Sequence, residues 1–313
     1  MKKITLLLSF IACVVFAQAQ LLLNENFDYA VGQELIPNGW LNTGTAATPN
    51  ILVTATSITY AGYPGSGIGN EVTLLNGQDV NHVFTAQTSG IVYASFLVNA
   101  SVVPLTGDYF IHFGADVMGS GFVGRVFVKK DATNKVAFGI QLNSGGTIVP
   151  TYTSFDYDLN TTYLIVLKHD NTGKVSSIIV NPSMSTEPST GWFNDSQGTN
   201  AVPANIGSIG LRQPSASAGL NLKLDGLRVA TSYAALFTIT GLSAPSATAF
   251  KAIVSGKNLL VKNVANGSIV EIYSALGAKV QTSELINGSV EINNLSKGLY
   301  IVRVGKNVQK IML

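Results

Sequence analysis

Short apolar runs separated by turn residues are the feature that most constrains how this chain folds. Between Gln20 and about Phe237, segments rich in β-branched and aromatic residues alternate with clusters of Gly, Asn, Asp and Pro, and no helical period is present. Regular short strands with turns between them are typical of a sandwich or a jelly roll. The clearest predicted strands are Gly90–Val98, Tyr109–Phe113, Val123–Val128, Val136–Ile140 and Tyr163–Leu167. The sequence therefore predicts an all-β fold.

One hairpin can be placed from its turn chemistry. Asp170-Asn171-Thr172-Gly173 separates a strand that ends at Lys168 from a second one over Val175–Val180. Asp, Asn and Gly favour the backbone angles of tight turns. We expect these two strands to pair.

The composition changes near residue 238 and indicates a second domain. Residues 238–250 lose the apolar pattern and are rich in Ser, Thr, Ala and Pro, as in a linker. Further strands are predicted over Leu259–Lys262, Ile269–Tyr273, Val290–Ile292, Leu299–Val304 and Val308–Leu313. We therefore predict a large jelly-roll β-sandwich over residues 20–237 and a small immunoglobulin-like β-sandwich over residues 251–313. So short a domain without disulfides should be only modestly stable.

The first 19 residues have the composition of a secretory signal peptide. Lys2 and Lys3 precede an apolar run over Ile4–Phe16, and Ala17-Gln18-Ala19 supplies small residues for cleavage. The only cysteine, Cys13, lies within that run, so the mature protein is expected to have no disulfide. No later apolar stretch is long enough for a membrane-spanning helix. These features predict export.

The charge balance argues against nucleic acid as a partner. Without Lys2 and Lys3, the chain has 17 basic and 17 acidic residues. Residues 20–250 carry nine basic and 14 acidic residues, and residues 251–313 carry eight and three. Neither part has the concentrated positive charge of a polyanion-binding stripe.

The C-terminal segment resembles the type A sorting domain of the Bacteroidetes type IX secretion system. The resemblance rests on an apolar strand, a turn with Gly, a Leu-x-x-Gly-x-Tyr motif and a terminal strand that contains Lys. The matching positions are Tyr273, Gly277, Leu295, Gly298, Tyr300 and Lys310. Ser274 stands where the family usually has Asn. The resemblance implies recognition by the secretion translocon and a secreted or outer-membrane surface location, with the protein either released or anchored to lipopolysaccharide.

The larger segment resembles concanavalin A-like, laminin-G-like jelly-roll domains of exported bacterial proteins. The residues that carry the resemblance are Asn24–Tyr29, Val92–Val98, Ile179–Pro182 and Leu224–Ala230. In that fold the first and last strands are neighbours, which would bring Glu25 or Asp28 near Asp225. Carboxylates that converge with backbone carbonyls suit Ca²⁺, which would have a structural role here. Alternatively, these carboxylates cap turns or pair with Arg228.

Related jelly rolls commonly bind carbohydrate through aromatic rings that stack on sugars, so aromatic residues in turn-rich segments are candidate contacts. They are Trp40, Tyr63, Tyr152, Tyr157 and Trp192. Each is alternatively a core residue, and the sequence does not separate the two roles.

Catalysis is not expected. Asp156 and Asp158 have a spacing similar to the paired carboxylates of retaining glycosidases, but they precede a strand in a polar segment. His82, His112 and His169 lack metal-ligand spacing, and Gly62–Gly69 is followed by no helix that could hold phosphate. We predict a non-catalytic carbohydrate-binding or adhesin-like protein. The alternatives are a glycan hydrolase or lyase and a purely structural surface protein.

Overall fold

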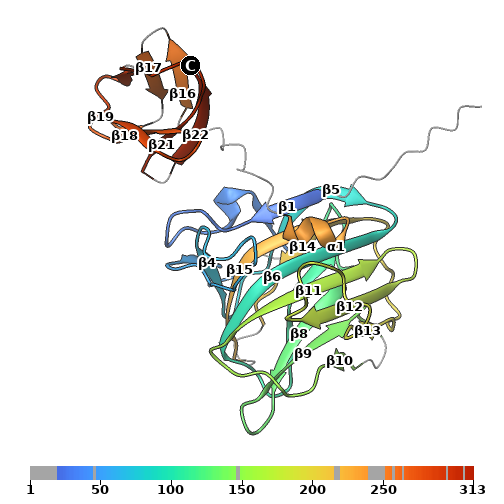
Figure 1. The fold of residues 1–313 in the computed structure, drawn as a ribbon. Coiled ribbons are helices and arrows are strands. Elements are labelled where there is room, and N and C mark those ends of the chain that lie inside the picture. Colours follow the sequence, from blue (N-terminus) through green and yellow to red (C-terminus); the bar gives the residue numbers. More distant parts are fainter. Residues whose placement is uncertain are drawn as a thin grey trace, which may run out of the picture. The chain divides into compact units, whose positions relative to one another are not determined.

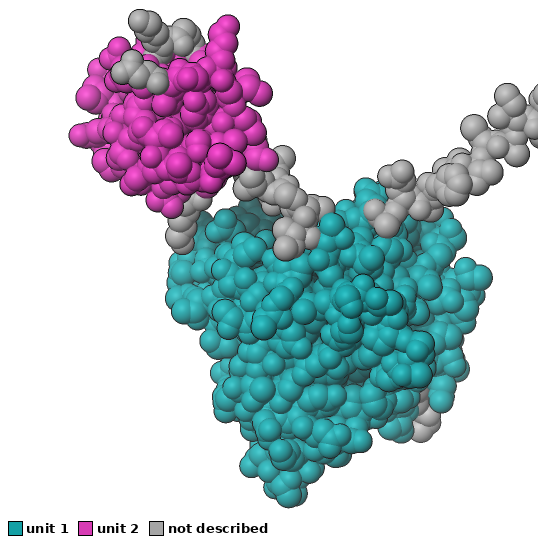
Figure 2. Space-filling model, in the orientation of Figure 1, with its two compact units in different colours: residues 1–239 teal, residues 240–313 magenta. Residues whose placement is uncertain are grey.

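The structure is a computed structural model, and it divides the chain into two compact units. They comprise residues 1–239 and 240–313 (Figure 2). The structure describes residues 20–44, 47–145, 149–214, 219–238, 251–255, 258–262, 264–293, 295–305 and 307–313. The predicted signal peptide (1–19) and residues 239–250 of the predicted linker lie outside the described residues. Within the described part, no helix is long and apolar enough to cross a membrane.

The large unit consists of two antiparallel sheets packed face to face (Figure 1). The eight-stranded sheet has β1 beside β15 and otherwise the order β13 (Phe193–Asp195), β12 (Val175–Val180), β11 (Thr162–Asp170), β6 (Ile91–Val102), β15 (Asn221–Ala230), β4 (Glu71–Leu74) and β3 (Val53–Thr54). The seven-stranded sheet has the order β10 (Thr151–Tyr152), β9 (Val136–Gln141), β8 (Val123–Lys130), β7 (Asp108–Gly114), β14 (Ile206–Leu211), β5 (Val80–Gln87) and β2 (Trp40–Asn42). The predicted all-β jelly roll is confirmed.

Two sequence-based pairings are also confirmed. β11 and β12 form the predicted hairpin, with Asp170 opposite Val175. β1 (Leu21–Glu25) pairs with the last strand of the unit, β15, so that Glu25 lies opposite Leu227. Short helical segments, η1 (Ile36–Asn38) and α1 (Tyr233–Phe237), complete the described elements of this unit.

Alternation along each strand builds the core between the sheets. In β8, Val126 and Val128 are fully buried against the opposite sheet, whereas Arg125, Phe127 and Lys129 point to the outer side. Burying a large apolar side chain contributes about 1.5–3 kcal/mol relative to leaving it exposed. The alternation of side chains along each strand therefore determines both which residues form the core and which remain available on the outer faces.

The outer face of the eight-stranded sheet is partly covered by its own chain. The Tyr63 hydroxyl hydrogen-bonds to the carbonyl oxygen of Gly226 at 2.5 Å and to Ser95 Oγ at 2.8 Å. Asp225 accepts hydrogen bonds from Ser57 Oγ at 2.6 Å and from the Ile58 amide at 2.8 Å. These contacts hold the segment after β3 over an irregularity in the β15–β6 pairing.

The small unit is also built from two sheets around its own core. One sheet has the order β16 (Lys251–Ser255), β17 (Asn258–Lys262) and β20 (Ser289–Glu291); the other has β19 (Lys279–Glu284), β18 (Ile269–Ser274), β21 (Leu299–Val304) and β22 (Asn307–Met312). The five strands predicted from the sequence overlap β17, β18, β20, β21 and β22. Sequence analysis missed β16 and β19.

Gly226 offers a test of the packing over β15. Its φ is +59°, and an added Cβ would lie 2.9 Å from Tyr63 Cε1 and 3.2 Å from the Gly65 carbonyl oxygen. Gly226→Ala should lower the free energy of unfolding by about 2–3 kcal/mol, because overpacking adds to the cost of a left-handed backbone. Gly90→Ala is the matched control, since Gly90 has φ +72° and nothing within 4 Å of the added Cβ. Equal losses in urea unfolding of both variants would show that the Tyr63 contact is unimportant.

The pH dependence of the free energy of unfolding should reveal the titration of the Asp225 carboxyl group. Burial raises the pKa of this carboxyl group to about 7. A raised folded-state pKa stabilises the fold at low pH, and that contribution is lost as pH rises through about 7. Between pH 6 and 8, the stability of the wild type relative to Asp225→Asn should fall by about 1 kcal/mol.

The comparison with Asp225→Asn cancels the opposite contribution of His112 and His169, in both of which burial lowers the pKa to about 4. Urea titrations at pH 6, 7 and 8 measure the difference between the two proteins. A difference that stays constant across this range would contradict the shifted pKa of Asp225.

Candidate functional site

A row of aromatic rings crosses the outer side of the seven-stranded sheet. Tyr152 on β10 lies opposite Gly139 on β9, Gly139 opposite Phe127 on β8, and Phe127 opposite Tyr109 on β7. The centroid of the Phe127 ring is 5.5 Å from that of Tyr109 and 6.5 Å from that of Tyr152. All three rings are partly exposed. The row thus depends on the register of four neighbouring strands, because each of its three rings comes from a different strand.

Two glycines make room for rings on this surface. A Cβ at Gly139 would lie 2.6 Å from the ring of Tyr152, and a Cβ at Gly210 would lie 2.5 Å from the ring of His112. The two rings therefore lie across the glycine positions instead of standing up from the sheet. Phe122 packs beside His112 with a centroid distance of 4.1 Å.

Three cations lie among these rings. The Arg125 guanidinium is 5.0 Å from the centroid of Tyr109, the Lys129 ammonium is 3.8 Å from that of Tyr152, and the Arg212 guanidinium is 4.2 Å from that of Tyr109. Lys129 also lies 5.3 Å from the ring centroid of the more exposed Phe155. We call this surface the aromatic face, defined by Tyr109, Phe122, Phe127, Tyr152, Phe155, Arg125, Lys129 and Arg212.

The charge state of the aromatic face follows from burial. Burial raises the pKa of Tyr109, and it raises the pKa of Tyr152 to about 12, so both hydroxyls stay protonated at neutral pH. Burial also keeps His112 neutral by lowering its pKa to about 4. Arg212 forms an ion pair with Asp108 at 2.6 Å. The aromatic face therefore combines neutral rings with fixed positive charges.

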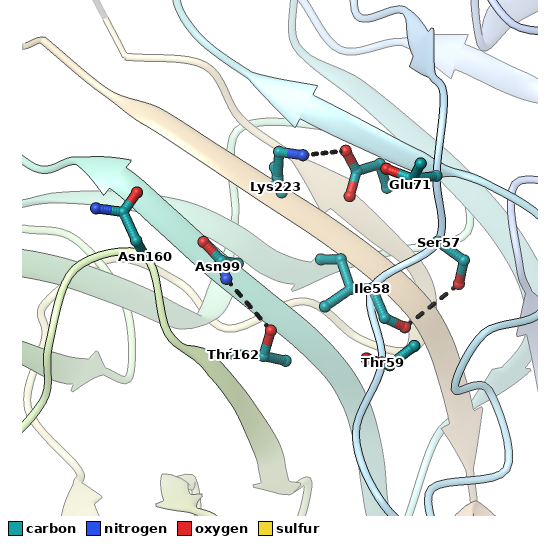
Figure 3. A pocket seen from close by; sticks show the side chains of 9 residues that line it. Ser57, Ile58, Thr59, Glu71, Asn99, Asn160, Thr162 and Lys223 are labelled. Atoms are coloured by element: carbon teal, nitrogen blue, oxygen red, sulfur yellow. Dashed lines mark hydrogen bonds and ion pairs between the residues drawn. The ribbon is translucent and has the colours of Figure 1, made fainter.

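A polar trough lies on the outer side of the other sheet (Figure 3). Asn99 on β6 lies opposite both Thr162 on β11 and Lys223 on β15. Lys223 forms an ion pair with Glu71 at 2.5 Å, and Asn99 donates to Thr162 at 3.3 Å. The trough has a volume of about 390 Å³ and is lined by Thr56, Ser57, Ile58, Thr59, Glu71, Asn99, Asn160, Thr162 and Lys223. Its described lining contains no aromatic ring.

Only one of the five predicted carbohydrate contacts lies on the aromatic face, and two were wrong. Tyr152 lies on the face. Trp40 is fully buried, where its Nε1 donates to Glu25 at 3.3 Å, and Tyr63 is 4% exposed. Trp40 is buried in the core between the sheets, and Tyr63 is buried in the cluster on the outer side of the eight-stranded sheet, so neither ring can stack on a sugar.

The other two predicted contacts lie elsewhere. Tyr157 packs on Phe138 and Tyr163, with centroid distances of 5.3 and 5.0 Å. Trp192 packs on Tyr233 and donates from Nε1 to the Pro188 carbonyl oxygen at 2.9 Å. Both side chains are partly buried. A binding role for either one stays a prediction.

The predicted calcium ligands have separate hydrogen-bond partners, and a calcium site stays a prediction. Glu25 accepts from the Phe27 amide at 2.6 Å, from Tyr29 Oη at 2.5 Å and from Trp40 Nε1, whereas Asp225 is held by Ser57, Ile58 and its neighbour Gly226. Asp28 is exposed. Pairing of β1 with β15 brings the strands together, but separate sets of donors already occupy the two buried carboxylates. In the described residues, no three His, Cys, Asp or Glu side chains are grouped to hold a metal ion.

The remaining candidates occupy structural positions. Asp158 forms an exposed ion pair with Lys135 at 2.6 Å, and Asp156 is exposed nearby. His169 is fully buried, with Nδ1 2.9 Å from Ser176 Oγ. His82 packs edge-on against Trp40.

Sequence reasoning missed most of the aromatic face. Tyr109, Phe122, Phe127 and Phe155 and the cations Arg125, Lys129 and Arg212 were not singled out. A usable pattern was present in β8, where Arg125, Phe127 and Lys129 alternate with Val126 and Val128. An aromatic residue on the polar side of an alternating strand indicates a surface ring.

The sorting-motif residues lie at the turns and strands of the small unit. Gly277 has φ +85° and closes the turn from Ser274 to Ala278. Leu295 and Tyr300 pack against the small core, and Tyr300 Oη donates to the Ser296 carbonyl oxygen at 3.0 Å. Tyr273 donates to Glu271 at 3.1 Å on β18, Gly298 exchanges backbone hydrogen bonds with Leu313, and Lys310 is exposed on β22.

Comparisons with solved structures give resemblances of low sequence identity. The chain is similar to domain 4 of AbnA, an extracellular arabinanase from Geobacillus stearothermophilus, with 12% identity, a TM-score of 0.43 and coverage of 71% of this chain and 99% of that one. It is also similar to lectin I-B4 from Griffonia simplicifolia, with 9% identity, a TM-score of 0.36 and coverage of 66% and 98%. No curated protein matches the chain.

Residues 251–312 match the family model described as the secretion system C-terminal sorting domain. This range coincides with the small unit and contains every residue of the motif noted in the sequence. The small unit is therefore a type IX secretion sorting domain, and the protein is exported to the cell surface or the extracellular space.

Proposed function

We propose that the large unit binds polysaccharide on its aromatic face and does not cleave it. The observation that carries this proposal is the cross-strand row of partly exposed rings formed by Tyr152, Phe127 and Tyr109. Aromatic rings bury the apolar faces of sugar rings, and flanking polar groups fix the hydroxyls. A row across four neighbouring strands spans about 14 Å, which suits an extended chain of sugars.

The polar trough is the less suitable surface for this role. Its ionic groups, Glu71 and Lys223, are already paired, and its described lining offers no ring for stacking. The aromatic face supplies rings from β7, β8 and β10.

The carboxylates near the aromatic face support a binding role over hydrolysis. Glycoside hydrolysis uses two carboxyl groups on either side of the scissile bond. Asp108 is ion-paired with Arg212, and Asp79 accepts the backbone N–H of Gln213 at 2.9 Å. Both groups are thus held by structural partners near one end of the face.

Removing one ring of the row should weaken binding. Phe127→Ala and Tyr152→Ala in the mature chain should each weaken polysaccharide retention about five- to hundredfold, because stacking on one aromatic side chain is worth about 1–3 kcal/mol in platforms that bind nucleobases. Affinity electrophoresis against a panel of soluble polysaccharides measures the retention. Tyr60→Ala is the control, since Tyr60 is a partly buried tyrosine over the other sheet.

The same mixtures separate binding from catalysis and test for calcium. Retention without new reducing ends is the expected result; product formation that Asp79→Asn or Asp108→Asn abolishes would establish a hydrolase instead. Retention that disappears on chelation would show that the protein needs calcium for binding or for its fold. Retention unchanged in Phe127→Ala and Tyr152→Ala would place binding off the aromatic face and overturn the proposal.

A further inference from the structure

Two cations of the aromatic face have no acidic partner. Arg125 donates from one terminal nitrogen to Gln141 Oε1, and its Nε has no hydrogen-bond partner although it is buried. In the described part of the chain, neither Arg125 nor Lys129 forms an ion pair. Of the other basic residues in this unit, Lys135, Lys168, Arg212 and Lys223 are each paired with a carboxylate, whereas Lys130, Lys174 and Arg228 also form no ion pair with the described residues.

The rings fix these two charges in place. Arg125 lies 5.0 Å from the centroid of Tyr109 and 5.7 Å from that of Phe127, and Lys129 lies 3.8 Å from that of Tyr152. Contact with an aromatic face stabilises a cation by about 0.5–2 kcal/mol without neutralising it. The cations are therefore held in position while their charge remains available to a ligand.

Partial burial of an unneutralised charge is unfavourable for the fold. Burial lowers the pKa of Arg125, since desolvation disfavours its charged form. An apolar side chain between Tyr109 and Phe127 would avoid this cost. A ligand carboxylate would remove it in the complex, since charge-assisted hydrogen bonds are stronger in a partly desolvated site.

The spacing suits several charges along one ligand. Arg125, Phe127 and Lys129 project from the same side of β8, so the two cations flank the central ring. Four residues of a strand span about 13 Å. Because Lys129 lies beside Tyr152 and Arg125 beside Tyr109, a polymer that follows the row across the strands can bring a carboxylate to each cation while its sugar rings cover Phe127.

Building on the proposed carbohydrate function, we propose that the ligand is an acidic polysaccharide of uronic acids, with Arg125 and Lys129 as its carboxylate contacts. A planar guanidinium matches carboxylate geometry. Nucleic acid suits the site less well, because two free cations do not form the track that neutralises successive phosphates.

The test compares one polysaccharide in a charged form and in a neutral form. Mature protein is titrated with polygalacturonate and with its methyl-esterified, neutral form, at low and at high salt. We expect at least tenfold tighter binding to the acidic form at low salt, and a smaller difference at high salt because exposed charges are screened.

Variants that remove one positive charge show which residues cause the preference for the acidic polymer. Arg125→Gln and Lys129→Gln should each reduce affinity for polygalacturonate about tenfold and affinity for the ester by a much smaller factor, so that the preference for the acidic polymer is lost. Lys174→Gln is the matched control, because it removes the same charge from the exposed turn between β11 and β12. Melting temperatures of the variants confirm that the fold is retained.

The outcomes separate this proposal from the carbohydrate proposal on which it rests. Equal binding of both polymers overturns the acidic preference and leaves carbohydrate binding intact, whereas binding of neither, with failure across the polysaccharide panel, overturns both. An acidic preference that survives Arg125→Gln and Lys129→Gln also contradicts the proposed contacts. Equal affinity for dextran sulfate or single-stranded DNA would mean a general polyanion surface and would overturn the assignment to carboxylates.

Discussion

Face-to-face packing of two antiparallel sheets is the constraint on which the rest of the large unit depends. Each strand must place one side in the shared core, so its other side is necessarily presented outward. In β8 this rule buries Val126 and Val128 and leaves Arg125, Phe127 and Lys129 outside. The core and the aromatic face are thus two consequences of one alternating pattern.

The two outer faces differ because of what covers them. On the eight-stranded sheet, the segment with Tyr63 and helix α1 pack their own apolar side chains against the strands. Asp225 holds part of that segment through hydrogen bonds to Ser57 and Ile58. On the seven-stranded sheet, Tyr109, Phe127 and Tyr152 remain partly exposed. A row of partly exposed rings is therefore presented on the second sheet.

Export and the proposed ligand binding involve separate parts of the chain. The small unit has its own core, which includes Leu259, Ile272 and Val302, and it carries the sorting motif. The aromatic face lies wholly within the large unit. Each role can therefore be examined by substitutions that leave the other unit intact.

The sequence by itself determined the all-β class, the β11–β12 hairpin and the sorting motif around Gly277 and Tyr300, because all of these depend on local alternation and turn chemistry. It did not distinguish Trp40, a core residue, from Tyr152, a surface ring, since both are aromatic residues near turns. Only the tertiary structure decided that β10, β9, β8 and β7 are neighbours, and so brought Tyr152, Phe127 and Tyr109 into one row. It also decided that Glu25 and Asp225 meet separate donors despite lying on paired strands. Strand register and the choice of covered face arise from contacts between residues far apart in the chain, which no local pattern specifies.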